Sequence, residues 1–230
     1  MKPYHQIAIA ECGEPLVPIP LEDFAVISPH PYLELGADYN GRSPYFLRQS
    51  VLEALERAKQ HLQQLRPGWK IQIFDAYRPV EVQKFMVDYT FTTVLQARNL
   101  TLADLSPQQQ EAIWEEVYEL WAVPSENPAT PPPHSTGAAV DVRLLDAAGE
   151  IVDMGGEIDE LSARSQPDYY LNSTEPRDRD YCDRRQLLKT VMVEAGFAAH
   201  PGEWWHFSLG DQMWAWLTQS PVARYGRWTI

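Results

Sequence analysis

The stretch PPPHSTGAAVDV, Pro131 to Val142, places one histidine and one aspartate at the entrance to an apolar strand. The three prolines before His134 lack backbone donors and disfavour a helix, so they deliver the chain in an extended form. Asp141 lies in a run of small and apolar residues that predicts a strand over residues 138–145. Two polar groups at the mouth of a strand indicate a functional site, although two ligands alone do not form a metal centre.

The rest of the chain predicts a mixture of helices and strands. Apolar residues at helical spacing predict helices over residues 48–65, 80–97, 106–122 and 183–195. Ser106 with Gln109 forms a capping box at the start of the third helix, and Gly196 ends the last. Alternation predicts further strands in WKIQIFD (69–75) and in GEWWHFSLG (202–210). Because no regular βαβ order is present, we expect an α+β fold with a central antiparallel sheet flanked by helices.

Composition limits the classes of function. With 230 residues, of which 44% are hydrophobic, the chain can bury a substantial core, and we expect a single domain over residues 1–230. A net charge of −13 argues against nucleic acid or an anionic membrane as a partner. No apolar run reaches the ~18 residues of a membrane span, and the first 20 residues have no signal-peptide pattern. Cys12 and Cys182 form no CxxC motif, so we expect a cytoplasmic protein; oligomeric state leaves no trace in the sequence.

Three polar clusters stand at the edges of predicted strands, and neighbouring antiparallel strands would bring them together. They are Asp75/Tyr77/Arg78, His134/Asp141 and Glu203/His206. A catalytic zinc takes three protein ligands from nitrogen and carboxylate oxygen and keeps a fourth position open, so His134, Asp141 and His206 fit that role.

The remaining polar groups of these clusters fit the chemistry of hydrolysis. Glu203, three residues before His206, would act as general base and acid. Arg78 would stabilise the oxyanion of an amide or ester under hydrolysis.

Every element of this hypothesis has a structural alternative. A lone histidine is usually a core or surface residue, and we assign His5, His30, His61 and His200 to that class. Asp141 is equally suited to a strand end and Glu203 to the surface. An exposed Asp75–Arg78 pair would contribute only ~0–1 kcal/mol. The HExxH helix of many zinc peptidases is absent.

Four motifs in order give the chain a family resemblance. They are DAYRP (75–79), HSTGAAVD (134–141), MGGEID (154–159) and EWWHF (203–207). Over roughly residues 20–210 the chain resembles the D-alanyl-D-alanine dipeptidases of the VanX type (subfamily D of the M15 peptidases), zinc DD-peptidases that share a fold with hedgehog signalling domains. The resemblance implies a single zinc peptidase domain that hydrolyses D-Ala-D-Ala to two D-alanines.

The resemblance also implies roles for individual residues. One Zn²⁺ per chain would be held by His134, Asp141 and His206, with Glu203 as catalytic base and Arg78 as transition-state stabiliser. Asp159 matches the aspartate that in relatives pairs with the free ammonium of the dipeptide. Tyr77 and Ser135, inside the matched motifs, are expected to contact substrate as well, and Gly137 is expected to allow a tight turn before the strand.

The chain departs from the family pattern at several points. Pro132 stands where relatives usually carry a serine, Ile158 stands where phenylalanine is common, and a helical insertion at about residues 88–130 is expected to form a lid. Two alternative functions remain open. One is a DD- or LD-carboxypeptidase acting on longer peptidoglycan peptides, and the other is a non-catalytic, hedgehog-like zinc-binding domain.

Overall fold

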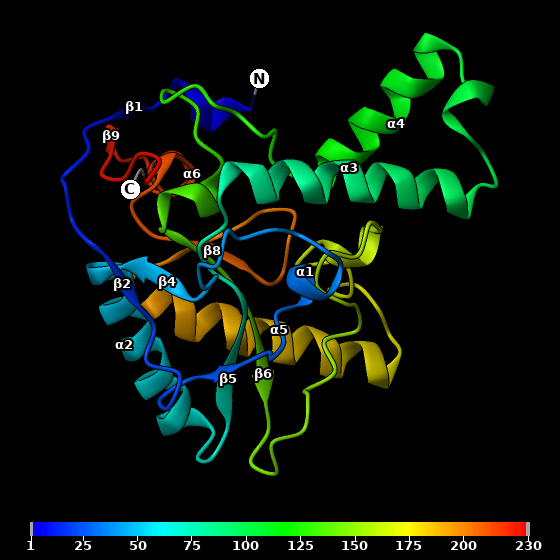
Figure 1. Cartoon of the computed structure of the whole chain (residues 1–230). Coiled ribbons are helices and arrows are strands. Elements are labelled where there is room, and N and C mark those ends of the chain that lie inside the picture. The colour runs from blue at the N-terminus through cyan, green and yellow to red at the C-terminus, as the bar shows by residue number, and fades with distance from the viewer. Residues whose placement is uncertain (1, 229–230) are drawn as a thin grey trace.

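A five-stranded sheet flanked by helices forms the centre of the molecule, as the computed structural model of the chain shows for residues 2–228 (Figure 1). In spatial order its strands are β3 (Ala25–Val26), β5 (Lys70–Asp75), β6 (Ala139–Leu145), β8 (His206–Ser208) and β7 (Ala198–Ala199). Every neighbouring pair is antiparallel except β3 and β5 at one edge, which are parallel. The predicted antiparallel sheet is therefore confirmed, with one parallel edge strand added.

Two small sheets join the ends of the chain to this centre. Strand β1 (Ala8–Ile9) pairs with β9 (Val222–Ala223), and β2 (Leu16–Pro18) pairs with β4 (Phe46–Arg48). The buried Arg48 side chain ties both sheets to the turn before β6, because it donates hydrogen bonds to the carbonyls of Thr136 and Gly226.

The helices agree with the sequence in most of their bounds. They are α1 (Pro31–Glu34), α2 (Gln49–Leu65), α3 (Val80–Ala97), α4 (Pro107–Leu120), α5 (Pro176–Glu194) and α6 (Gln212–Leu217). The capping box of Ser106 and Gln109 is present at the start of α4. Helix α5 begins seven residues before the predicted start at 183, because a proline in the first turn starts it inside a charged segment that has no apolar stripe. Helix α6 was not predicted from the sequence, in which the last expected helix covers residues 183–195.

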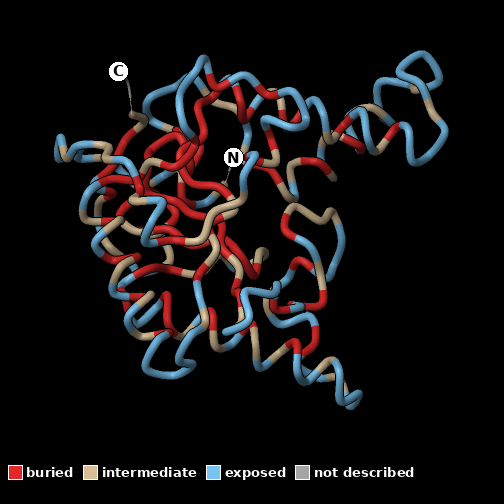
Figure 2. The backbone as a smooth tube through the Cα atoms, turned by 60° about the horizontal axis from the view of Figure 1, so that its bottom comes forward, coloured by how far each residue is buried: buried red, intermediate tan, exposed pale blue. Residues whose placement is uncertain are grey.

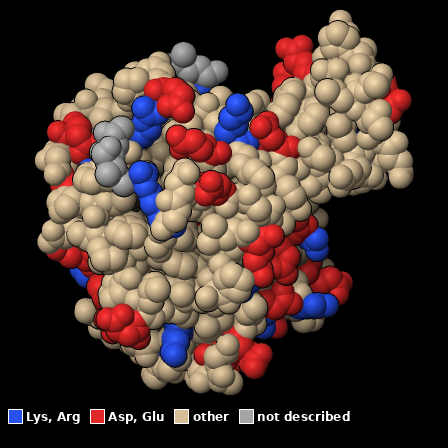
Figure 3. Space-filling view, viewed as in Figure 1, with Lys and Arg blue, Asp and Glu red and all other residues tan. Residues whose placement is uncertain are grey.

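The core lies between the sheet and the helices α2 and α5, which pack on each other (Figure 1). Figure 2 shows this central region as buried backbone, whereas one extension of the chain is largely exposed. That extension, here named the α3–α4 arm (residues 80–120), contributes Phe91, Ile113 and Val117 to a second apolar cluster, which also contains Tyr32 and Tyr39. It projects from the body of the molecule in the space-filling view of Figure 3. Among the described residues, no helix is both long and apolar enough to cross a membrane.

Candidate active site

Strand register brings three polar side chains from distant parts of the sequence into one row. Asp75 of β5 pairs with Asp141 of β6, and Asp141 pairs with His206 of β8. Directly paired residues of neighbouring strands point to the same face, so their side chains lie together. We name these three residues the polar row. They are 0%, 2% and 5% exposed, so the row is enclosed by the fold.

His134 reaches the row from a short 3-10 turn directly before β6. Gly137 ends this turn in a left-handed conformation with φ of 72°, and a Cβ atom there would lie 2.2 Å from the Leu16 side chain. Glycine is therefore required, as the sequence predicted. The hydroxyls of Ser135 and Thr136 donate to backbone carbonyls of the same turn, so they shape the turn that carries His134.

His134, Asp141 and His206 have the spacing of metal ligands. His134 Nε2 lies 3.2 Å from His206 Nδ1 and 3.2 Å from an Asp141 oxygen, and His206 Nδ1 lies 3.0 Å from the other Asp141 oxygen. Ligands about 2.0–2.1 Å from a tetrahedral zinc would be about 3.3 Å apart, close to these separations. These three residues can thus surround a metal ion without rearrangement.

The hydrogen bonds of the two imidazoles support the same conclusion. His134 Nδ1 lies 2.7 Å from the carbonyl oxygen of Ala76. Because a carbonyl can only accept, Nδ1 carries the proton and Nε2 presents a lone pair. His206 Nε2 lies 3.3 Å from Ser208 Oγ, which leaves Nδ1 facing the other two side chains. Such outer hydrogen bonds orient metal-binding histidines in proteins.

Glu203 lies beside this group and does not replace any member of it. One of its oxygens is 3.8 Å from His206 Nδ1, and the other is 3.6 Å from His200 Nδ1. Burial and the charge of Asp141 raise the pKa of Glu203 well above its usual range. Burial alone would also raise the pKa of Asp141, but the adjacent imidazoles of His134 and His206 hold it well below. The pKa values of the neighbouring carboxyl groups of Glu203 and Asp141 are thus shifted in opposite directions.

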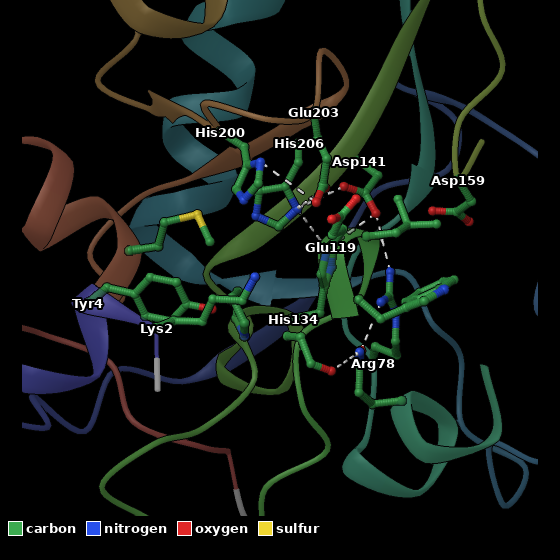
Figure 4. Close-up of a pocket in the computed structure, with 16 residues that line it drawn as sticks. Lys2, Tyr4, Arg78, Glu119, His134, Asp141, Asp159, His200, Glu203 and His206 are labelled. Carbon is green, nitrogen blue, oxygen red and sulfur yellow. Dashed lines mark hydrogen bonds and ion pairs between the residues drawn. The ribbon is translucent and has the colours of Figure 1, made fainter. Parts of the chain in front are cut away.

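Hydrogen bonds to several side chains hold Arg78 in place, and Figure 4 marks the one to Asp141. Its Nε donates to Asp75, its Nη1 to Gln83, and its Nη2 to both Asp141 and the Tyr32 hydroxyl. The side chain is only 4% exposed, so the Asp75–Arg78 pair is buried rather than a surface salt bridge across a turn. The guanidinium therefore supplies a fixed positive charge next to the candidate metal ligands.

Asp159 lies across the cavity from the imidazole rings in Figure 4. Its carboxylate accepts a hydrogen bond of 2.7 Å from the Tyr32 hydroxyl. Its backbone φ of 62° is left-handed, a conformation that aspartate tolerates better than most residues. Burial and the charge of Asp141 raise its pKa to about 7. Among the described residues, no lysine or arginine forms an ion pair with this carboxyl group, which would gain a cationic partner from a bound ammonium.

One small cavity of about 60 Å³ joins most of the predicted site residues. Its lining includes Arg78, His134, Asp141, Asp159, Glu203 and His206. The structure does not bring Tyr77 and Ser135 to this cavity. Both line a separate hollow next to Trp228, because their side chains leave the turn-forming segments on the opposite side.

The structure adds residues that sequence reasoning left out. Tyr32 and Gln83 fix Arg78. His200, which we expected to be an ordinary core or surface residue, lines the cavity, and burial together with His206 lowers its pKa to about 3. Lys2 lines the cavity as well. None of the four lies inside a motif, although His200 lies only three residues before Glu203 and its predicted strand.

Known proteins with similar sequences share one description. The family model of the M15 peptidases, described as D-ala-D-ala dipeptidase, matches residues 26–223. A D-alanyl-D-alanine dipeptidase of Synechocystis is 54% identical over 99% of this chain and 97% of that protein. Proteins of the same description from Escherichia coli and Enterococcus faecium are 29% and 27% identical, over 82% and 73% of this chain and 84% and 73% of theirs.

A solved structure of a vancomycin-resistance D,D-pentapeptidase in complex with Zn(II) aligns with 90% of this chain and 88% of its own. The identity is 14% and the TM-score 0.45, too low to bear on fold or function. The sequence matches cover nearly the whole chain, and the cavity holds a His–Asp–His group that could bind a metal ion, with a carboxyl group beside it. The chain therefore belongs to the D-Ala-D-Ala dipeptidase family of metallopeptidases, peptidase family M15.

Proposed function

We propose that this protein is a zinc-dependent dipeptidase that hydrolyses D-Ala-D-Ala to two D-alanines. The observation that carries the proposal is the convergence of a His–Asp–His triad, a carboxyl group of raised pKa and a fixed guanidinium in one small cavity. The names of the relatives support the dipeptide as substrate.

His134, Asp141 and His206 would hold one zinc ion per chain. When bound there, zinc supplies a Lewis acid that polarises a carbonyl and makes water a better nucleophile at neutral pH. The hydrogen bond from His134 to Ala76 keeps the imidazole in the tautomer that can bind the ion.

Glu203 would move the proton of the reaction. One carboxylate oxygen of Glu203 takes a proton from the attacking water. The same group then delivers this proton to the nitrogen of the leaving D-alanine. Burial and the charge of Asp141 move the pKa of Glu203 upward, in the direction that lets one carboxyl group both take up and release a proton near neutral pH. Its position 3.8 Å from His206 Nδ1 puts it beside the triad without making it a fourth ligand.

Arg78 and Asp159 would stabilise two opposite charges, the developing oxyanion and the ammonium of the substrate. Arg78 stabilises the negative charge that develops on the carbonyl oxygen, and its hydrogen bonds hold it ready so that no reorganisation is needed. Asp159 would accept the free ammonium of the dipeptide by a charge-assisted hydrogen bond.

The test is release of free D-alanine from D-Ala-D-Ala by the purified protein, with zinc content measured before and after chelation. We expect release to disappear with the metal and to return when zinc is added. Bound zinc without release of D-alanine would contradict the proposal. Faster release from a pentapeptide than from the dipeptide would favour a carboxypeptidase instead.

A further inference from the structure

Lys2 brings a second positive charge to the catalytic cavity from the far end of the sequence. Its side chain lines the cavity together with Glu203 and His206, and its Nζ donates a hydrogen bond of 3.1 Å to the carbonyl of Tyr118 in the last turn of α4. The following 3-10 turn, Pro3–Gln6, packs against α6, and Tyr4 of that turn is buried at the same cavity. The first residues of the described chain are thus part of the site wall.

Arg78 and Lys2 differ in how many of their hydrogen-bond donors are free to bind a ligand. Arg78 donates to two carboxylates, an amide and a hydroxyl. Within the part of the chain that the structure describes, the Lys2 ammonium makes a single hydrogen bond, to a neutral carbonyl, and a lysine ammonium has three donors. Of the described cationic side chains that line the cavity, Lys2 is therefore the one with donors available for a ligand.

Lys2 also lines a hollow that adjoins the cavity. A larger hollow of about 530 Å³ shares Lys2, Glu119 and Glu203 with the catalytic cavity and is lined also by Glu116 and Glu160. Among the described residues of its lining, Lys2 is the sole lysine or arginine. An anionic group that enters past these glutamates meets one favourable partner, the Lys2 ammonium.

Lys2 and Asp159 lie on opposite sides of the metal-binding group (Figure 4). Asp159 bonds Tyr32 on the side of Arg78, whereas Lys2 lies on the side of Tyr4 and α4. The cavity thus offers a carboxylate at one end and an ammonium at the other, with Glu203 between them. A free dipeptide has the matching arrangement, an ammonium at its first residue and a carboxylate at its second.

We propose that Lys2 binds the C-terminal carboxylate of the substrate and thereby makes a free carboxyl group on the leaving residue a requirement for hydrolysis. This inference rests on the proposed dipeptidase function. It assigns specificity to the N-terminal segment, outside the four motifs. It also couples that segment to the end of α4 through the Tyr118 carbonyl.

The experiment compares D-Ala-D-Ala with its C-terminal amide, D-Ala-D-alaninamide, on the zinc-loaded protein and on Lys2→Gln, Lys2→Arg and Lys84→Gln. Lys84 is an exposed residue of α3 and serves as the matched control. We expect the parent protein to prefer the free acid by about 10-fold or more in kcat/KM, the size expected of one charge-assisted hydrogen bond. In Lys2→Gln the preference should fall toward one, mainly through a higher KM for the acid.

The expected pattern is completed by the controls: Lys2→Arg keeps most of the preference, and Lys84→Gln keeps all of it. Unchanged zinc content in Lys2→Gln would show that the metal site is intact. A merely structural role of Lys2 would slow hydrolysis of both substrates alike, whereas a binding role slows only that of the free acid. An unchanged acid-to-amide ratio in Lys2→Gln overturns the inference and leaves the dipeptidase function standing. A parent protein that cleaves neither substrate overturns the proposed function and this inference with it.

Discussion

The polar row and the α3–α4 arm border the same cavity but are built in opposite ways. The row joins Asp75, Asp141 and His206 through strand register, and its side chains are almost fully buried. The arm is set by local signals at its helix ends, such as the exposed Ser106 cap, and packs largely in the second apolar cluster. The side chains of the polar row, which must keep fixed positions relative to one another, thus lie in the sheet. The part of the cavity wall at the substrate entrance lies on helices α3 and α4.

The largest expected effect comes from removing a metal ligand in the row. In His134→Ala, two ligands remain, so we expect the protein to lose its zinc and D-alanine release to fall about a thousandfold or more. Zinc content and activity measured on the same sample test this. His61→Ala, at a partly exposed site on α2, should retain both. Full activity in His134→Ala would remove this histidine from the metal site.

Glu203→Gln should separate chemistry from metal binding. The amide has nearly the same shape as the carboxyl group but cannot take up a proton, so we expect kcat to fall about 10²- to 10⁴-fold. Zinc content should stay at the parent level, since Glu203 is not one of the three ligands. Metal content and kcat that fall in proportion would instead make Glu203 part of the metal site.

Asp75→Asn should break the row at its one member that is not a proposed metal ligand. Asp75 is fully buried and bonds Arg78 and His30, so its loss leaves a buried guanidinium short of its partner and should cost about 3–5 kcal/mol of unfolding free energy. Denaturant unfolding followed by circular dichroism measures this cost. The exposed Asp104→Asn should cost far less.

The same substitution predicts a pH dependence. Although burial alone would raise the pKa of Asp75, the Arg78 charge and the His30 hydrogen bond hold it well below its usual range. A depressed folded-state pKa contributes stability that is complete above the unfolded pKa of about 3.9 and is lost as the pH falls toward the folded value. The difference between parent protein and Asp75→Asn should therefore be largest near neutral pH and shrink below about pH 4. A difference that grows in acid would contradict the assigned cause.

The smallest effect is expected in the arm. Ser106→Ala removes the acceptor for the Gln109 backbone amide at the start of α4 and should cost about 1 kcal/mol. Amide hydrogen exchange in residues 107–120 should become faster, whereas zinc content should not change. Loss of zinc in Ser106→Ala would show that the arm and the row are coupled more strongly than their packing indicates.

The sequence alone was sufficient where structure depends on local periodicity or on compact motifs. Helices α2 and α3, the cap of α4 and strands β5 and β6 follow their predicted bounds to within one or two residues. Gly137 was predicted from the turn that it allows, and the structure brings together the six residues proposed for metal binding, catalysis and ammonium binding. The roles of the metal ligands, Glu203 and Arg78 were proposed from residue chemistry and matched by the family motifs, whereas the role of Asp159 came from the motifs alone.

Only the tertiary structure decided what surrounds those residues. The parallel edge strand β3, the positions of Tyr77 and Ser135 outside the cavity, and the contacts of Tyr32, His200 and Lys2 leave no periodic or motif signal in the sequence. The physical reason is that these features depend on strand register and on side-chain packing between segments far apart along the chain. Lys2 and Tyr118, 116 positions apart, meet only when the whole domain has folded.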